Sequence, residues 1–261
     1  SVERACRLLG LELRKVPVDD EFRLRPDALE LDGASATVAT VGTTSTTSVD
    51  PVAAVVEACA PAGVWVHVDA AYAGSAMVCP DLRWAFDGIG GVDSLVVNPH
   101  KWLLTSQGCS AFWTRRPDDL RAAFSLVPEY LRTDDEVVSL SEYSVELGRG
   151  FRALKLWMTI KTFGLAAMRR GIEHGIRTAE RTEELLRAAG WEIETPAQLG
   201  IVSFRRGHDA ERHLRTVAEM QAEGVAAISS TVLHGVTVLR MCTINPATTV
   251  ADLEATVAAL E

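Results

Sequence analysis

The sequence predicts an α/β fold with a mainly parallel sheet, helices on both faces of that sheet, and a small α+β domain after it. Apolar, valine-rich runs at residues 36–42, 64–68 and 93–98 are typical of strands buried in a parallel sheet. A helix-forming segment lies between the first two runs, as a parallel connection requires. After residue 147, long helical segments alternate with short strands, which predicts a helix-covered, mainly antiparallel second domain.

The elements around these strands follow from local signals. Apolar spacing predicts a helix over residues 1–10, and the alternating segment at 11–19 predicts a strand. A short helix is expected to begin at Pro26, because proline suits the first helical turn. Asp50 is expected to cap a helix whose first residue is Pro51.

The second half of the chain is predicted to be mainly helical. A long helix is expected to run from Phe151 to a stop at Gly190, and Thr249 is expected to cap the last helix. The strands and helices expected between and after these points lie at residues 191–194, 200–206, 209–224, 237–242 and 249–261.

Composition limits the possible functions. The 261 residues are 48% hydrophobic and 23% charged, as in globular proteins of one large or two modest domains. The net charge of −9, without a basic block, argues against nucleic acid as a partner. No apolar run approaches the ~18 residues of a membrane helix, and the first ten residues lack a signal-peptide pattern. The 5 cysteines are scattered without CxxC spacing, which predicts reduced thiols and a cytoplasmic location.

Two charged residues follow neighbouring predicted strands. Asp69 ends the run at 64–68, and Lys101 follows the run at 93–98. Each alone is read as a turn former or a solvated charge. Ligands of open α/β sheets bind beyond the carboxyl ends of the strands, so the two together suit pyridoxal 5'-phosphate (PLP). Its aldehyde needs a lysine amine, and its ring nitrogen needs a carboxylate to stay protonated. The apolar neighbour Trp102 predicts that the amine is buried, which would favour its neutral form.

His67 and Asp69 lie two residues apart and therefore share one face of a strand. This pair could supply two metal ligands, but two are too few and no third follows nearby. We therefore expect no metal and interpret His67 as a core or supporting histidine.

The segments HVDAAYAGSAMVCPDLR (67–83) and NPHKWLL (98–104) resemble the cofactor core of the group II PLP-dependent amino-acid decarboxylases, most closely the aromatic L-amino-acid decarboxylase branch. The resemblance extends from Ser1 to about Leu260. It implies a fold-type I PLP-dependent transferase. The implied domains are the second part of a PLP-binding large domain at 1–124, a mobile active-site loop at 125–146, and a linking helix with a small domain at 147–261.

The resemblance also implies roles for individual residues. Lys101 is matched to the lysine that forms the Schiff base, and Asp69 to the partner of the ring nitrogen. Tyr130 is matched to the loop tyrosine that protonates the substrate α-carbon after carbon dioxide leaves, and Tyr143 is a weaker rival. Gly148 is matched to a glycine that reaches the partner subunit's phosphate. The implied cofactor-binding residues are Thr44, Asp69, Ala71, Asn98, His100, Lys101 and Gly148.

The function implied is decarboxylation of an L-amino acid to its amine and carbon dioxide. Tyr72 and Ala73 favour an aromatic substrate, because the glutamate branch usually has tryptophan and glycine there. Family members are much longer, so an N-terminal half is expected from a missing segment or another chain, in a homodimer or heteromer.

Two alternatives stay open. One is an aldehyde synthase or another fold-type I lyase, although relatives that make aldehydes tend to have phenylalanine in place of Tyr130. The other is a non-catalytic partner subunit, which the presence of both Lys101 and Asp69 argues against.

Overall fold

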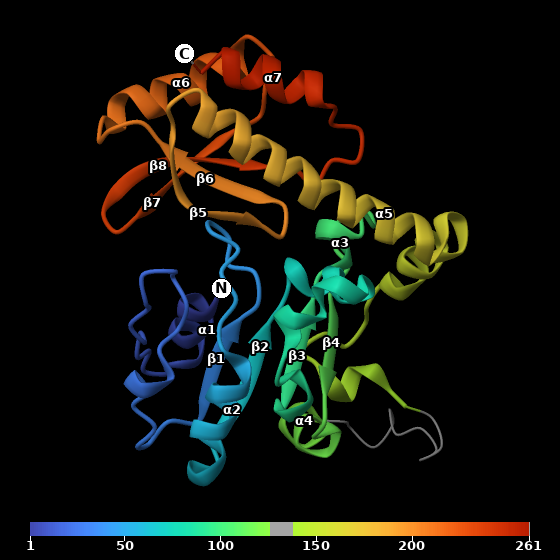
Figure 1. Ribbon diagram of the computed structural model, residues 1–261. Coiled ribbons are helices and arrows are strands. Elements are labelled where there is room, and N and C mark those ends of the chain that lie inside the picture. The colour runs from blue at the N-terminus through green and yellow to red at the C-terminus, as the bar shows by residue number, and fades with distance from the viewer. Residues whose placement is uncertain (126–137, 261) are drawn as a thin grey trace.

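The computed structural model describes residues 1–125 and 138–260, which form two four-stranded sheets (Figure 1). The first sheet has the order β1 (Ala36–Thr40), β2 (Trp65–Asp69), β3 (Ser94–Val97) and β4 (Ala111–Thr114). The second sheet has the order β5 (Glu192–Gln198), β6 (Ile201–Arg205), β8 (Val236–Cys242) and β7 (Ser229–Leu233).

The first sheet is mainly parallel, as expected. Strands β1, β2 and β3 run parallel, and β4 is antiparallel to β3. The register places Asp69 beside Thr40 on one side and Val96 on the other, so the carboxyl ends of these strands are level. The mixed α/β class predicted from the sequence is confirmed.

Burial of the first sheet differs between its two faces. On β2, Val66 and Val68 are 3% and 0% exposed, whereas the alternate residues are only half-buried. Helix α2 (Val52–Cys59) packs against β1 and β2. Complete burial of β2 on both faces, which the apolar runs predicted, is therefore wrong for the described residues.

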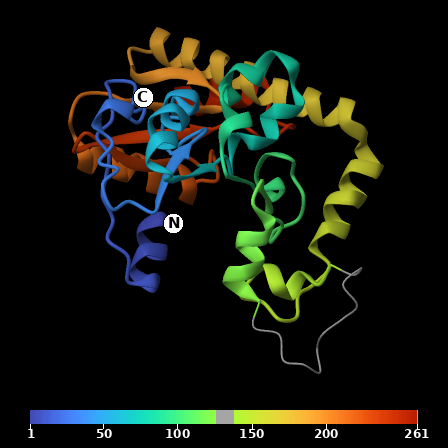
Figure 2. The same cartoon turned by 90° about the horizontal axis from the view of Figure 1, so that it is seen from below.

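Helices pack against both sheets. The longest, α5, bends at Gly164, whose φ of 74° and ψ of 158° are not helical, before it runs along the second sheet (Figures 1 and 2). No helix in the described ranges is both long enough and apolar enough to cross a membrane. The α-helices other than α2 are α1 (Val2–Leu9), α3 (Pro99–Trp102), α4 (Pro117–Phe124), α5 (Arg152–Ala188), α6 (Ala210–Ala222) and α7 (Val250–Ala258).

Two hydrophobic cores hold the molecule together. One lies around the first sheet and α2, and the other lies between the second sheet and α5, α6 and α7. Ile172 on α5 and Leu199 after β5 belong to the first core, with 1% and 1% exposure. The second sheet and its helices, residues 152–260, which we call the C-terminal unit, therefore complete the core of the first sheet. The domain boundaries at 124 and 146 stay a prediction.

Several local expectations are wrong. Residues 11–19 form no strand but only an isolated bridge from Val18 to Leu24, because this segment pairs with its own return at 22–25 and not with a sheet. Pro26 begins a single 3-10 turn. The strand β7 was not expected, because its sequence SSTVL begins with polar residues.

Asp50 does not cap α2. Its two carboxylate oxygens accept the backbone N–H groups of Leu24 and Thr40, at 2.7 and 2.6 Å. The carboxylate thus fastens the N-terminal segment to β1, and burial raises the pKa of Asp50.

Candidate active site

Asp69 and Lys101 lie at the same edge of the first sheet. Asp69 is the last residue of β2, and its Oδ1 accepts the N–H of Ala71 at 3.0 Å. Lys101 lies on α3, directly after β3, and its N–H donates to the carbonyl of Asn98 at 2.9 Å. Because β2 and β3 are parallel neighbours, both residues lie at the edge where ligands of open α/β sheets bind.

Backbone hydrogen bonds connect these two strand ends. The N–H of Ala70 donates to Val96 O at 3.1 Å, and the N–H of Asn98 donates to Ala71 O at 3.0 Å. The ladder between β2 and β3 is thus extended past both strands. The backbones that carry the acid and the amine are fixed relative to each other.

The side chains of Asp69 and Lys101 are free for a ligand. Within residues 1–125 and 138–260, no ion pair joins them to each other or to any other group. Asp69 Oδ1 is used by a backbone N–H, which leaves Oδ2 as an acceptor. A free carboxylate and a free primary amine at one sheet edge fit the two ends of PLP, so the residues present suit this cofactor.

The expectation that Lys101 is buried is wrong for the described chain. Lys101 is exposed, whereas the next residue, Trp102, is only 3% exposed. Consecutive residues of a helix point about 100° apart, so the indole packs into the protein while the amine points outward. The apolar neighbour therefore anchors this turn and does not surround the amine.

Residues flanking Lys101 are held by the following loop. The Asn98 side-chain oxygen accepts a hydrogen bond from the hydroxyl of Ser110. The His100 Nδ1 atom lies 2.5 Å from the carbonyl oxygen of Cys109, which is 3% exposed. Ala71, on the β2 side, is 8% exposed. The structure thus brings Asn98, His100 and Ala71 to the same edge as Asp69 and Lys101, and their cofactor contacts stay predictions.

Thr44 lies on the loop after β1, at residues 43–48, which contacts the C-terminal unit. Its own carbonyl accepts a hydrogen bond from Arg240 Nε at 2.6 Å. Thr44 is exposed, but Thr46, Thr47 and Ser48 are 3%, 0% and 1% exposed. Most of this hydroxyl-rich loop is therefore buried, and the contact of Thr44 with a cofactor stays a prediction.

His67 has the supporting place that the sequence indicates. Its Nδ1 lies 2.8 Å from Ser94 Oγ, and its ring stacks on Phe112 with centroids 6.1 Å apart. Burial lowers the pKa of His67, an effect that the charge of Asp69 partly opposes. Among the residues described, no three His, Cys, Asp or Glu side chains converge on a metal position.

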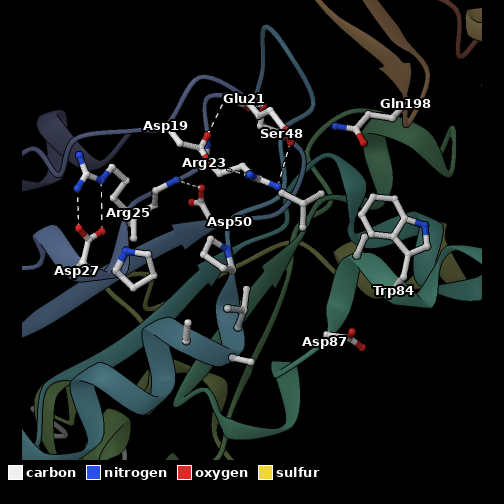
Figure 3. A pocket seen from close by; sticks show the side chains of 18 residues that line it. Asp19, Glu21, Arg23, Arg25, Asp27, Ser48, Asp50, Trp84, Asp87 and Gln198 are labelled. Atoms are coloured by element: carbon white, nitrogen blue, oxygen red, sulfur yellow. Dashed lines mark hydrogen bonds and ion pairs between the residues drawn. The ribbon is translucent and has the colours of Figure 1, made fainter.

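A cavity of about 720 Å³ lies elsewhere, beside the N-terminus of α2 (Figure 3). Neither Asp69 nor Lys101 lines it. Its arginines Arg23 and Arg25 are paired with Asp19 and Asp27 at 2.8 and 2.6 Å. We place the candidate site at the strand ends and not in this cavity. The two cavity arginines are ion-paired, whereas Asp69 and Lys101 have no ion-pair partner among the described residues.

Three predicted residues from the loop region cannot be placed at the strand ends. Tyr130 lies outside the described residues. Tyr143 ends a 3-10 turn at Leu140–Tyr143. Gly148 is exposed, and no atom lies within 4 Å of where a Cβ would stand. The roles of all three stay predictions.

Sequence reasoning missed Tyr72 and Trp102 as parts of the site. Their rings stack with centroids 5.0 Å apart and an interplanar angle of 9°. The available signal was their position, since Tyr72 follows Asp69 by three residues and Trp102 follows Lys101 directly.

The fold and the strand-end groups together define a class, a mixed α/β protein with a free acid and a free amine at the ends of parallel strands. Residues 1–206 match the family described as the pyridoxal-dependent decarboxylase conserved domain. The chain therefore belongs to this family. This confirms the resemblance of residues 67–83 and 98–104 to group II PLP decarboxylases.

Individual relatives agree with the aromatic branch. The chain is 34% identical to an aromatic-L-amino-acid decarboxylase of Bacillus atrophaeus, over 97% of this chain and 58% of the relative. The structure of Oryza sativa TDC with PLP and tryptamine superposes with a TM-score of 0.91 and 33% identity, over 99% of this chain and 59% of that one. The structure of the 4-hydroxyphenylacetaldehyde synthase of Rhodiola rosea superposes with a TM-score of 0.88 and 26% identity, over 99% of this chain and 58% of that one. The chain thus spans less than two thirds of the length of each.

Proposed function

We propose that the protein carrying this chain is a PLP-dependent carboxy-lyase that converts an aromatic L-amino acid to its amine and carbon dioxide. The observation that carries the proposal is the pair Asp69 and Lys101, which have no ion-pair partner among the described residues and stand on backbones joined at one sheet edge. Family membership and the relatives' activities support the same reading.

In this proposal Lys101 holds the cofactor through its amine, and Asp69 Oδ2 accepts the N–H of the cofactor ring. When bound, PLP supplies an electron-withdrawing ring that weakens the bond between the substrate α-carbon and its carboxylate. Asp69 keeps the ring nitrogen protonated, and the N–H of Ala71 fixes the orientation of that carboxylate. The small side chain of Ala71 leaves room for a flat ring beside the backbone.

Tyr130 is proposed to deliver a proton to the substrate α-carbon after carbon dioxide has left. A phenol on a closing loop suits this step, because closure also excludes competing water. Asn98, His100 and Thr44 are proposed to line the cofactor, and Gly148 to reach a partner subunit in a homodimer or a heteromer. The proposed location is the cytoplasm.

The test uses the full-length protein with whatever segments flank residues 1–261. It is incubated with PLP and a panel of aromatic and acidic L-amino acids, and amine and carbon dioxide are measured together with aldehyde and peroxide. Equal amounts of amine and carbon dioxide from an aromatic substrate are expected. Turnover of acidic substrates alone would contradict the aromatic assignment.

The second candidate, an aldehyde synthase, is favoured by one observation, the likeness to the Rhodiola rosea enzyme. Aldehyde and peroxide as the main products of the unaltered protein would establish it. The variant Tyr130→Phe is expected to shift product from amine toward aldehyde. A shift in Tyr143→Phe and not in Tyr130→Phe would instead assign the proton transfer to Tyr143.

A further inference from the structure

The C-terminal unit contacts the loops that follow all three parallel strands of the first sheet. After β1, Thr47 Oγ1 donates to the carbonyl of Gln198 at 2.7 Å, and Ser203 donates to the carbonyl of Ser45. After β2, Tyr72 Oη donates to the carbonyl of Leu199 at 2.7 Å. After β3, Trp102 lies beside Gly175 and Gly200 of the C-terminal unit. The sheet edge that carries the candidate active site is therefore also the edge that the C-terminal unit contacts.

The stacked pair of Tyr72 and Trp102 fits against two glycines of the C-terminal unit. A Cβ on Gly200 would lie 3.1 Å from Tyr72 Oη and 3.2 Å from Trp102 Cζ2. A Cβ on Gly175 would lie 3.5 Å from Trp102 Nε1. Thr243 joins the two glycines, because its Oγ1 donates to the carbonyls of Gly175 and Gly200 at 2.8 and 3.2 Å. The rings therefore rest on a surface where one more carbon at Gly200 would be in unusually tight contact.

The contacts of the pair depend on shape more than on polarity. Trp102 is 3% exposed, and its indole N–H has no hydrogen-bond partner among the described groups. Leaving a buried donor unpaired costs free energy, so the packing of the Trp102 ring must contribute enough stability to offset that cost. Burial raises the pKa of Tyr72, so its phenol stays protonated and donates to Leu199.

We infer that the Tyr72–Trp102 pair, seated on Gly175 and Gly200, positions Asp69 and Lys101 and transmits the placement of the C-terminal unit to the cofactor site. This rests on the proposed function, which assigns the cofactor to that acid and that amine. Neither ring is required to touch the cofactor or the substrate. Tyr72 and Trp102 are positioning residues, because a short stretch of backbone links Tyr72 to Asp69 and Trp102 to Lys101.

The sharpest test replaces two glycines of the same helix. Gly175→Ala would bring a methyl group 3.3 Å from Thr243 O and 3.5 Å from Trp102 Nε1, whereas Gly171→Ala meets nothing within 4 Å. Both changes gain the same intrinsic helix propensity, so they differ mainly in the new contacts at Gly175, which press on the backbone of Thr243 and Ile244 and reach Trp102. The full-length protein is used, with PLP as the probe.

The readouts are the PLP dissociation constant, the visible absorbance and circular dichroism of bound PLP, and the pH at which that absorbance changes. Gly175→Ala is expected to weaken PLP binding about fivefold and to shift the spectrum, and Gly171→Ala to match the unaltered protein. Thermal unfolding is measured in parallel, since a merely structural role would change unfolding without changing the spectrum. Identical spectra and affinities for Gly175→Ala and Gly171→Ala would overturn the inference.

A second pair of variants guards against a glycine variant that does not fold. Tyr72→Phe removes only the hydrogen bond to Leu199, and Trp102→Phe shortens the stacked ring. Trp113→Phe is the matched control, because Trp113 is 54% exposed on β4. Altered PLP spectra in the first two and not in the control are expected. Unaltered spectra in all three would also overturn the inference.

The two proposals fail in distinguishable ways. If the unaltered protein binds no PLP, and borohydride fixes none to Lys101, the proposed function fails. If the unaltered protein binds PLP and the variants of Gly175, Tyr72 and Trp102 bind it identically, only the positioning inference fails.

Discussion

The strand-end edge and the junction with the C-terminal unit lie next to each other but are built in opposite ways. At the edge, Lys101 is exposed, Asp69 is half-buried, and neither side chain has an ion-pair partner among the described residues. At the junction, Thr47 and Trp102 are uncharged, buried at 0% and 3% exposure, and tightly packed. In the proposed function, the groups that would hold the cofactor are thus left without ion-pair partners, whereas the groups beside them are tightly packed.

The largest expected effect is the loss of the free amine. Lys101→Ala should abolish borohydride-fixed PLP and lower decarboxylation about 10⁴-fold or more, because no other group at this edge can take the amine's place. Peptide mapping after reduction and a rate assay measure both. Lys161→Ala is the control, an exposed lysine on α5. PLP that is still fixed by borohydride in Lys101→Ala would show that Lys101 is not the amine that holds the cofactor.

The next effect is the loss of the free negative charge. Asp69→Asn keeps a side-chain oxygen for the N–H of Ala71 but no longer stabilises a protonated ring nitrogen. Activity should fall about 10²–10³-fold, with unfolding little changed. Rates at saturating PLP and a urea titration give the two values. Asp81→Asn, at an exposed residue of a 3-10 helix, should change neither.

A smaller effect is expected at the junction, and it should appear in stability. Thr47→Val removes the hydroxyl that donates to Gln198 O at 2.7 Å and keeps the side-chain shape. The free energy of unfolding should drop by about 1–3 kcal/mol, since a buried acceptor is left unpaired. Thr216→Val, on the surface of α6, should stay within about 0.5 kcal/mol. Equal losses in both urea titrations would remove the distinction between the two regions.

The smallest effect concerns pH. Burial lowers the pKa of His67 below its ordinary value of 6.5, so the unfolded chain binds this proton more readily than the folded one. The contribution of His67 to stability is therefore complete above pH 6.5 and is lost as the pH falls through the folded-state pKa. His67→Gln should therefore reduce the pH dependence of the unfolding free energy below pH 6.5. The exposed His208→Gln should leave that slope as it is.

The sequence predicted the parts of the fold that depend on local patterns. Valine-rich runs gave β1, β2 and β3, and helical spacing gave the course of α5 up to Gly190. It also indicated Asp69 and Lys101, because a charge at the end of an apolar run is unusual enough to be noticed. Residues 11–19 were misread because Val18 pairs with Leu24 in a local hairpin, and the helix expected at Pro26 is a single 3-10 turn.

The rest of the site could not be predicted because it depends on contacts between distant segments. Nothing local in the run at 43–48 distinguishes a solvated loop from one buried against β5 and β6, more than a hundred residues away. Trp102 was interpreted as a cover for Lys101, and only the turn of α3 shows that the two point apart.

The sharing of Ile172 and Leu199 with the first hydrophobic core has a practical consequence. A fragment cut at residue 146 would end before both side chains and would leave an opening in the interior of the first sheet. Such a fragment should expose apolar surface and aggregate, although its boundary matches the one that the sequence suggests. A truncated version of this protein must therefore contain both the first sheet and the C-terminal unit.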